Sequence, residues 1–349
     1  MQIINTALLS FGMSGKVFHA PFVQLHRGFA LMGAWERSKK VFGEKYPGAR
    51  SYSSMEELLA GREVDLVIVN TPTFTHYEYA KKSLMAGKNV VVEKAFTTTT
   101  AEAEELKALA EKVGKKISVF QNRRWDSDFK TVREILNRGL LSEIVEATIS
   151  FDRYNPGLSP KQHKEIPGPG AGVVKDLGPH LIDQALVLFG MPQAVFGDLR
   201  ITRPLSQVDD YFEILLYYPK LRVRLKGGYF VREPVAAYVF HGRKGSFLKT
   251  RGDVQETQLL AGMTPDNPDY GIEPEAGQGI LHTEIEGKVI KEKVKTLPGN
   301  YMDYYEGVYQ AITANKTMPV TADDGIKVMQ IIEAALKSSR EKRLVEFPA

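Results

Sequence analysis

The chain is organised around one short run of residues, Lys88-Asn89-Val90-Val91-Val92-Glu93-Lys94-Ala95-Phe96. Three consecutive valines are typical of a strand buried on both faces of a parallel sheet. The charged pair Glu93 and Lys94 follows where that strand would end. Ligands of open α/β sheets bind outside the carboxyl ends of the strands, which predicts a functional role for Lys94. The alternative is a solvated surface lysine, the commoner fate of this residue type.

Apolar strands alternate with helices on both sides of this run. Strands are expected at residues 3–9, 29–35, 64–69 and 117–120, and helices at 55–59, 77–86 and 100–113. Such alternation predicts right-handed crossovers and a doubly wound parallel sheet, the Rossmann type of α/β fold. We therefore predict a dinucleotide-binding domain over residues 1–122.

A degenerate dinucleotide fingerprint follows the first strand. Ser10-Phe11-Gly12-Met13-Ser14-Gly15 has the spacing of G-x-G-x-x-G, with Ser10 in place of the first glycine. Gly12 would let the backbone approach a pyrophosphate, and Gly15 would let the helix pack closely on the strand. A plain strand-to-helix turn is the alternative.

The second strand ends in Glu36 and Arg37. An acid roughly 20 residues beyond the glycine loop is where an adenosine ribose diol is held, and Glu36 fits that role. Arg37, with Lys39 and Lys40 nearby, could instead hold a 2′-phosphate. The sequence thus predicts NAD(P) and leaves NAD versus NADP open.

Residues 123–349 are predicted to form a second, α+β domain. A helix is expected at 129–137, a half-buried alternating strand at 143–152, and further strands at 195–202, 212–218, 221–230 and 237–241. The result would be an open, largely antiparallel sheet. The Pro- and Gly-rich segment 155–172, which contains His163, is long for a loop and is predicted to cover a substrate.

Asp176 and His180 lie four residues apart at the start of an apolar helical pattern, which would put them on one helix face. A lone histidine on a helix is more often structural than catalytic. After a glycine-rich loop, in a chain with a dinucleotide fingerprint, the pair points instead to acid–base chemistry, because imidazole titrates near neutrality.

Composition excludes several classes of function. The 349 residues are 43% hydrophobic and 25% charged, with a net charge of +4 and no long basic run, so nucleic acid is not an expected partner. The absence of cysteine excludes disulfides and thiolate catalysis, and the seven scattered histidines indicate no metal site. With neither a long apolar run nor a basic, apolar start, we expect a cytoplasmic protein that does not enter membranes.

Several motifs together resemble one protein family, the Gfo/Idh/MocA oxidoreductases, from end to end of the chain. They are the glycine loop with Phe18-His19-Ala20-Pro21, Thr71-Pro72 with His76, Glu93-Lys94, and Asp176-Leu177-Gly178-Pro179-His180-Leu181-Ile182-Asp183. A second set is similar to the NADP-linked scyllo-inositol dehydrogenase branch: Asn122-Arg123-Arg124-Trp125-Asp126 with Asp128-Phe129, Tyr301 with Tyr304-Tyr305, and Pro319-Val320-Thr321-Ala322. Ala95 departs from the proline that usually follows Glu-Lys, as Ser10 departs from the fingerprint glycine, and neither change removes a reacting group.

The resemblance implies roles for individual residues. Lys94, Asp176 and His180 would form the catalytic site, with His180 taking the hydroxyl proton as hydride leaves the adjacent carbon. The implied cofactor contacts are Ser10, Gly12, Met13, Ser14, Gly15, Glu36, Arg37, Thr71, Pro72, His76, Glu93 and Asn122. The expected substrate contacts are Arg124, Asp126, Tyr154 and Asp183.

The expected function is that of an NAD(P)-dependent dehydrogenase acting on a secondary alcohol of a cyclic polyol or sugar. Two alternatives stay open: a non-catalytic NAD(P)-binding sensor or partner protein, and a lyase-type enzyme that uses bound NAD as a redox shuttle. We expect a homodimer or a tetramer, because the family pairs the outer face of the second sheet across a two-fold axis.

Overall fold

The structure, a computed structural model, describes residues 2–37, 40–159 and 162–348, without the side chains of Gln162 and His163. Lys39 and the His163 side chain therefore lie outside the described part of the chain. Packing divides the chain into two units. The first comprises residues 1–125, 255–270 and 300–326, and the second 126–254, 271–299 and 327–349. The predicted boundary at residue 122 did not anticipate that two later segments belong to the first unit.

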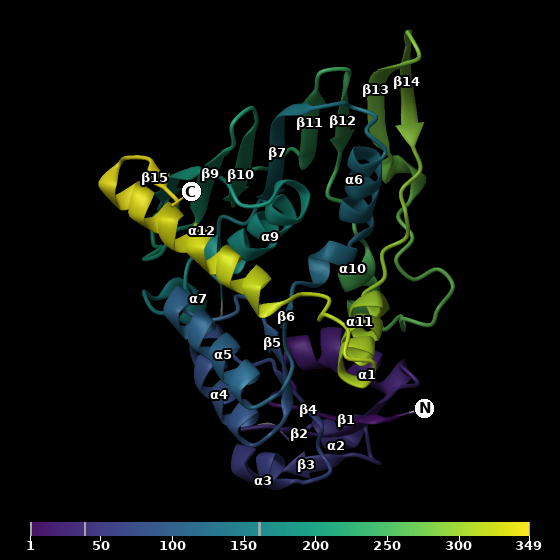
Figure 1. Cartoon of the computed structure of the whole chain (residues 1–349), viewed down its shortest axis with the longest axis vertical. Helices are drawn as coiled ribbons and strands as arrows, with labels where there is room; N and C mark the ends of the chain where they lie inside the picture. Colours follow the sequence, from purple (N-terminus) through teal and green to yellow (C-terminus); the bar gives the residue numbers. More distant parts are fainter. Residues whose placement is uncertain (1, 38–39, 160–161, 349) are drawn as a thin grey trace. The chain divides into compact units, whose positions relative to one another are not determined.

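Six parallel strands form the sheet of the first unit. They are β1 (Ile4–Leu8), β2 (Phe29–Trp35), β3 (Arg50–Tyr52), β4 (Leu66–Val69), β5 (Asn89–Glu93) and β6 (Ile117–Phe120), in the order β3-β2-β1-β4-β5-β6 (Figure 1). This is the strand order of a doubly wound dinucleotide-binding sheet, so the predicted fold is confirmed.

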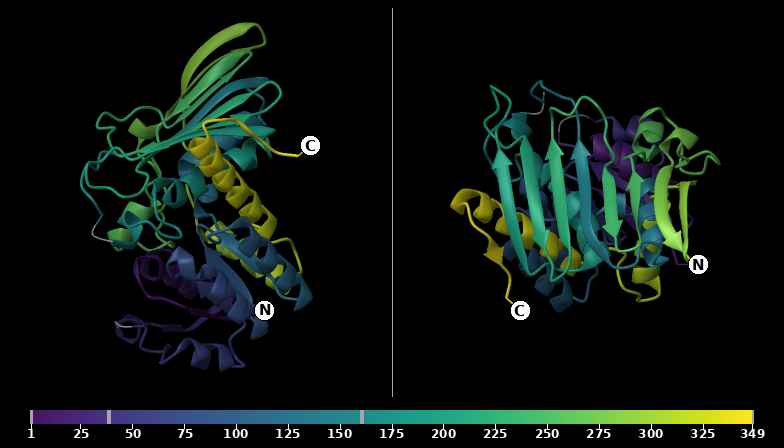
Figure 2. Two further views of the ribbon diagram at one scale, coloured as in Figure 1. Left: turned by 90° about the vertical axis from the view of Figure 1, so that its left-hand side faces the viewer. Right: turned by 90° about the horizontal axis from the view of Figure 1, so that it is seen from above.

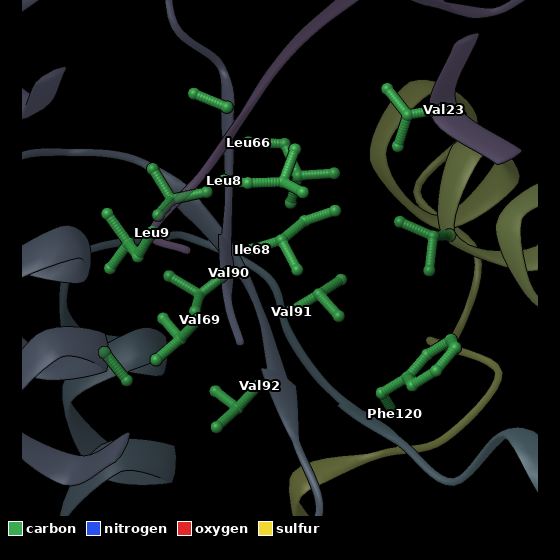
Figure 3. Close-up of a cluster of buried hydrophobic side chains, with 14 of the residues drawn as sticks. Leu8, Leu9, Val23, Leu66, Ile68, Val69, Val90, Val91, Val92 and Phe120 are labelled. Atoms are coloured by element: carbon green, nitrogen blue, oxygen red, sulfur yellow. The ribbon is translucent and has the colours of Figure 1, made fainter. Parts of the chain in front are cut away.

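The three valines of β5 explain the position of that strand. Residues 90–92 are at most 1% exposed, and Figure 3 shows their side chains close to Ile68 and Val69 of β4. Because β5 pairs with β4 on one side and β6 on the other, Glu93 is held at the carboxyl edge of the sheet.

Helix α5 of the first unit begins and ends where the sequence provides caps. Thr99 and Glu102 form a reciprocal capping box at the start of α5, and Gly114 follows that helix with a φ of +65°. The helical elements are η1 (a π-helix, Gly15–His19), α1 (Ala20–Leu25), α2 (Phe42–Lys45), α3 (Met55–Ala60), η2 (Thr73–Thr75), α4 (His76–Met85), α5 (Thr100–Lys112), η3 (Asn122–Trp125), α10 (Gln255–Leu260) and α11 (Met302–Thr313).

Nine strands form the sheet of the second unit. They are β7 (Ile144–Asp152), β8 (Ala194–Arg200), β9 (Tyr211–Tyr217), β10 (Arg222–Gly228), β11 (Tyr238–Gly242), β12 (Gly245–Lys249), β13 (Gly279–Ile285), β14 (Lys288–Val294) and β15 (Val345–Glu346). The order is β14-β13-β12-β11-β7-β10-β9-β8-β15, and every pairing except β7 with β10 is antiparallel. An open, largely antiparallel sheet was predicted and is confirmed.

The helices of the second unit leave one face of this sheet in view. They are α6 (Ser127–Asn137), α7 (Gln162–Glu165), α8 (Val173–Asp176), α9 (Gly178–Phe189) and η4 (Glu275–Gly277), while α12 (Ala322–Glu341) begins in the first unit and continues in the second. In the right-hand view of Figure 2 the strands lie in front of α9. Along β9, residues 212, 214 and 216 are fully buried, whereas Tyr211, Glu213, Leu215 and Tyr217 on the opposite face are partly exposed.

Candidate active site

The glycine loop lies between β1 and η1 and is built from short local contacts. The backbone N–H of Gly12 donates to the hydroxyl of Ser10 (3.2 Å), and the side-chain amide of Asn70 donates to the Ser10 carbonyl (2.8 Å). Ser10, which replaces the usual glycine, therefore holds the turn through its own hydroxyl. Met13 is 46% exposed at the tip of the loop.

The two glycines of the loop serve different purposes. A Cβ at Gly15 would lie 2.5 Å from the Ser10 carbonyl oxygen and 2.9 Å from the Asn70 amide nitrogen, so the fold itself requires glycine there. A Cβ at Gly12 would meet only the Ser10 hydroxyl, at 3.5 Å. Since the chain's own packing does not require Gly12, this position fits the close approach of a ligand such as a pyrophosphate.

Glu93 joins the glycine loop to Lys94. Its carboxylate accepts a hydrogen bond from the Ser14 hydroxyl and one from the Lys94 backbone N–H (3.1 Å), and it contacts Nε2 of His19 (3.1 Å). Burial raises the pKa of Glu93, but the hydrogen bond and charge of His19, the Ser14 hydroxyl and the Lys94 charge outweigh burial and hold that pKa below its usual value. An anionic Glu93 thus fixes both the loop and the start of the Lys94 segment.

His76 holds the other side of the Lys94 segment. One ring nitrogen of this buried histidine contacts the Ala95 carbonyl oxygen (2.8 Å) and the other the Thr71 carbonyl oxygen (2.9 Å). Burial lowers the pKa of His76, against the effect of these two hydrogen bonds. The Lys94–Ala95 peptide bond is cis. His76, predicted as a cofactor contact, therefore links the Thr71-Pro72 turn to the backbone next to Lys94.

Glu36 is engaged by its own chain. Both of its carboxylate oxygens accept backbone hydrogen bonds at the start of α2, from Val41 (3.3 Å) and Phe42 (2.9 Å), and the residue is only 6% exposed. Arg37, the next residue, is exposed. The carboxylate predicted to hold a ribose diol therefore also stabilises a helix N-terminus.

Asn122 and Arg124 lie on η3, after β6. Asn122 is 6% exposed. The Arg124 guanidinium, predicted as a substrate contact, donates to the Pro319 carbonyl oxygen (3.3 Å) and lies 3.5 Å from a carboxylate oxygen of Asp324. In the first unit, the structure thus brings together Ser14, Glu93, Lys94, Thr71 and His76, while Glu36 and Arg124 are held by other parts of the same unit.

Asp176 and His180 belong to the second unit and lie on two consecutive helices. Asp176 is the last residue of α8, and α9 begins at Gly178, so the single helix predicted here was wrong. The reason is Pro179 near the start of α9, because proline has no N–H to donate back to the preceding turn. His180 is 6% exposed and its backbone N–H donates to Leu177 (3.2 Å).

The loop before α8 provides a partner for Asp176. Nζ of Lys164, on α7, lies 2.7 Å from a carboxylate oxygen of Asp176. Sequence reasoning missed Lys164, since an isolated lysine in a Pro- and Gly-rich segment carries no signal. The other predicted substrate contacts differ in accessibility: Asp126 and Asp183 are 0% and 2% exposed, whereas Tyr154 is 45% exposed, with the Arg232 guanidinium 3.8 Å from its ring centre.

Neither a metal centre nor a membrane span is found in the described part of the chain. No group of three or more His, Cys, Asp or Glu side chains there is arranged to hold a metal ion. No helix among these residues is long and apolar enough to cross a bilayer.

Comparison with known proteins covers nearly the whole chain. The Gfo/Idh/MocA oxidoreductase family model for the NAD-binding Rossmann fold matches residues 4–121, and the model for its C-terminal alpha/beta domain matches residues 133–347. The scyllo-inositol 2-dehydrogenase (NADP(+)) of Bacillus subtilis is 37% identical over 348 residues, which are 99% of this chain and 96% of that protein.

Solved structures are similar over the same length. A protein from Bacteroides fragilis is 46% identical, with a TM-score of 0.91 over 99% of this chain and 100% of the other. An oxidoreductase from Bacillus cereus is 30% identical, with a TM-score of 0.93 over 99% of each chain.

Proposed function

The chain belongs to the Gfo/Idh/MocA family of oxidoreductases, and from this premise we propose that it is a dehydrogenase for a secondary alcohol of a cyclic polyol or sugar of the inositol type. The observation that carries the proposal is the anchoring of Lys94. Glu93 binds the Lys94 amide and Ser14 of the glycine loop at once, which fixes a lysine beside a dinucleotide-binding turn.

The residues of the chain would divide the chemistry between them. A bound nicotinamide supplies the acceptor for hydride. His180 takes the proton of the substrate hydroxyl, and the Lys94 ammonium stabilises negative charge on the same oxygen. Asp176, which forms an ion pair with Lys164, would orient the imidazole of His180.

We propose that NADP is the preferred cofactor. Both Glu36 oxygens are engaged by backbone N–H groups, which leaves this carboxylate poorly placed to hold a free ribose diol. Arg37 is exposed next to it and carries the positive charge that a 2′-phosphate needs. The similar Bacillus subtilis dehydrogenase is named for NADP.

The outer face of the nine-stranded sheet is the proposed surface for a homodimer or for a tetramer built from dimers. It carries the partly exposed side chains of β9 together with ionic and cation–π contacts. Arg224 pairs with Glu213 (2.8 Å), and the Arg222 guanidinium lies 4.4 Å from the Tyr217 ring centre. Mixed aromatic and arginine surfaces of this kind are typical of protein interfaces.

A substrate screen tests the proposed function. Inositols, sugars and sugar acids are incubated with the protein and either NAD or NADP, and the absorbance of reduced nicotinamide is followed. We expect turnover with at least one cyclic polyol or sugar and a higher kcat/KM with NADP. Binding of either dinucleotide without turnover on any substrate would favour the non-catalytic alternative. Net elimination without free reduced cofactor would favour the lyase alternative.

A further inference from the structure

His19 and Tyr305 form a buried chain of contacts that the proposed chemistry does not use. Nδ1 of His19 lies 2.8 Å from the Tyr305 hydroxyl oxygen, which lies 2.6 Å from the Phe18 carbonyl oxygen. Nε2 of His19 lies 3.1 Å from a carboxylate oxygen of Glu93. His19 is 0% exposed and Tyr305 1%, so water cannot replace any of these partners.

The hydrogens available to a neutral histidine are too few for these contacts. Three contacts need three hydrogens, because each must have one donor. The Phe18 carbonyl and the Glu93 carboxylate can only accept, so the hydrogens must come from the phenol, which has one, and from the imidazole ring. A neutral ring has one and a charged ring has two. Only the charged ring satisfies all three contacts.

Tyr304, next to Tyr305, provides a comparison in which there are as many hydrogens as contacts. The Tyr304 hydroxyl donates to the Ser118 hydroxyl (3.0 Å), which donates to the Val320 carbonyl oxygen (2.7 Å). Two contacts are served there by two hydroxyl hydrogens, without any additional proton.

The surroundings of His19 decide where the additional proton lies. Glu93 already accepts from Ser14 and from the Lys94 backbone and lies near the Lys94 charge, all of which favours a charged carboxylate. The other groups that face the ring are aromatic. Phe120 lies at a centroid distance of 4.5 Å, and burial raises the pKa of Tyr305 well above its usual value, which keeps the phenol neutral. The proton belongs on His19, where the charge of Glu93 compensates it.

We propose that His19 is a positioning residue: as a buried imidazolium paired with Glu93, it holds the glycine loop through Ser14 and the Lys94 backbone in one arrangement. This role rests on the proposed dehydrogenase function only in that the positioned groups are Lys94 and the cofactor loop.

Nitrogen NMR of the histidine rings tests the protonation state directly. The full chain is labelled with ¹⁵N-histidine, and its seven histidines are observed at pH 8, with His19 assigned by the signal lost in His19→Gln. We expect hydrogen on both ring nitrogens of His19. His76 is the internal control: it has two carbonyl partners and no carboxylate contact to compensate a charge. Burial lowers the pKa of His76, so its ring should carry one hydrogen and leave one of the two carbonyl contacts without a donor. A single hydrogen on the His19 ring would overturn the proposal.

A pair of variants tests the positioning role. His19→Leu removes every hydrogen bond, whereas His19→Gln retains an amide donor toward Glu93. We expect the dissociation constant for NADPH to rise roughly tenfold or more in His19→Leu, the usual worth of a hydrogen bond to a charged group, and clearly less in His19→Gln. Equal losses in the two variants would contradict positioning through Glu93.

Failure of the His19 proposal can be distinguished from failure of the proposed dehydrogenase function. The NMR spectra require neither substrate nor cofactor, so they test the proposal independently of enzyme activity. If the protein oxidises no polyol but His19 is doubly protonated, the proposed ion pair between His19 and Glu93 is retained and only the proposed function fails. A singly protonated His19 in an active dehydrogenase removes the ion pair and leaves the enzyme activity as proposed.

Discussion

His180 is the side chain on which the proposed proton transfer depends. Replacement by alanine should lower kcat by roughly 10²- to 10⁴-fold, the usual contribution of general acid–base catalysis, and leave the affinity for NADPH nearly unchanged. Steady-state kinetics with an authentic substrate and fluorescence titration of the cofactor measure the two effects.

Lys94→Met is the matched control for His180. It should also lower kcat, because the developing charge on the substrate oxygen loses its ammonium partner. The acidic limb of the pH profile in the oxidation direction should persist in Lys94→Met and disappear in His180→Ala. Near-normal kcat with an unaltered profile in His180→Ala would move the base role to Lys94 or Asp176.

We expect two adjacent residues, Arg37 and Glu36, to have different effects on cofactor binding. Arg37→Ala should raise KM for NADP by roughly tenfold and change KM for NAD little. Only NADP has a ribose 2′-phosphate, and this phosphate would lose its positively charged partner. Glu36→Gln should leave the ratio of the two cofactors unchanged and lower the free energy of unfolding by about 1 kcal/mol, because it weakens the cap of α2. A selective loss of NAD affinity in Glu36→Gln would restore the ribose role.

Arg203 helps to hold the predicted substrate segment 155–172 against the rest of the second unit. The Arg203 guanidinium donates to the Gly157 carbonyl oxygen (2.7 Å), to Glu165 of α7 (2.8 Å) and to Asp210 (3.0 Å), and its side chain is 3% exposed. Because Glu165 and Asp210 are also largely buried, loss of the arginine would leave two carboxylates without their partner.

Arg203→Ala should lower the free energy of unfolding by roughly 3 to 5 kcal/mol, as expected for breaking a buried ion pair. Arg203→Lys keeps the charge but cannot bind three acceptors in the same plane, so it should be intermediate. Urea unfolding measures stability, and limited proteolysis shows whether residues 155–172 become accessible to cleavage. An unchanged cleavage pattern in Arg203→Ala would contradict the fastening role.

The turn that leads into α8 depends on Asp209. Gly172 has a φ of +94°, and a Cβ there would lie 2.0 Å from an Asp209 carboxylate oxygen. The Val174 N–H donates to the same carboxylate (2.7 Å). Burial raises the pKa of Asp209 from 3.8 to about 6.

Stability should therefore fall with rising pH between about 3.8 and about 6 at this site, because the folded state holds the proton more tightly than the unfolded state. A shift of this size corresponds to roughly 3 kcal/mol. Urea unfolding of the wild type and of Asp209→Asn at several pH values measures the difference. The gap between the two should change over this window and become constant above it, and parallel curves would refute the assignment.

The elements that could be predicted are those whose sequence pattern reflects local burial. β4, β5 and β6 are continuous apolar runs because both faces of a parallel sheet are covered. β14 gave no such signal, since five of its seven residues are exposed and lysine occurs on both of its faces. α10 and α11 were also not predicted, and they belong to the first unit although they follow most of the second in the sequence.

In the candidate site, too, some residues could be predicted from local sequence patterns and others could not. The glycine loop and Lys94 follow from spacing along the chain. The contact between His19 and Tyr305 joins residues 286 positions apart, and periodicity carries no information over such a separation. Glu36 matched its motif position, but sequence could not reveal that α2 begins close enough for its backbone to compete for the carboxylate.

At the scale of the whole molecule, the sheet face of the second unit is expected to set the oligomeric state. Leu215→Glu and Arg224→Glu introduce negative charge on the proposed interface and should shift the mass in light scattering at micromolar concentration from a dimer or tetramer toward the monomer. Lys220→Glu, in the turn between β9 and β10, is the control and should keep the wild-type mass. A monomeric wild-type protein would contradict the assembly.

The two edges of the nine-stranded sheet limit how copies of this chain can meet. β14, one edge strand, presents Lys288, Lys291 and Lys293, and β15, the other, is only two residues long. Charged or very short edge strands discourage further strands from pairing, which is how natural sheets avoid growing into fibrils. Growth of the sheet by strand addition is therefore disfavoured at both ends, which favours the proposed association of copies through a face of the sheet over open-ended growth.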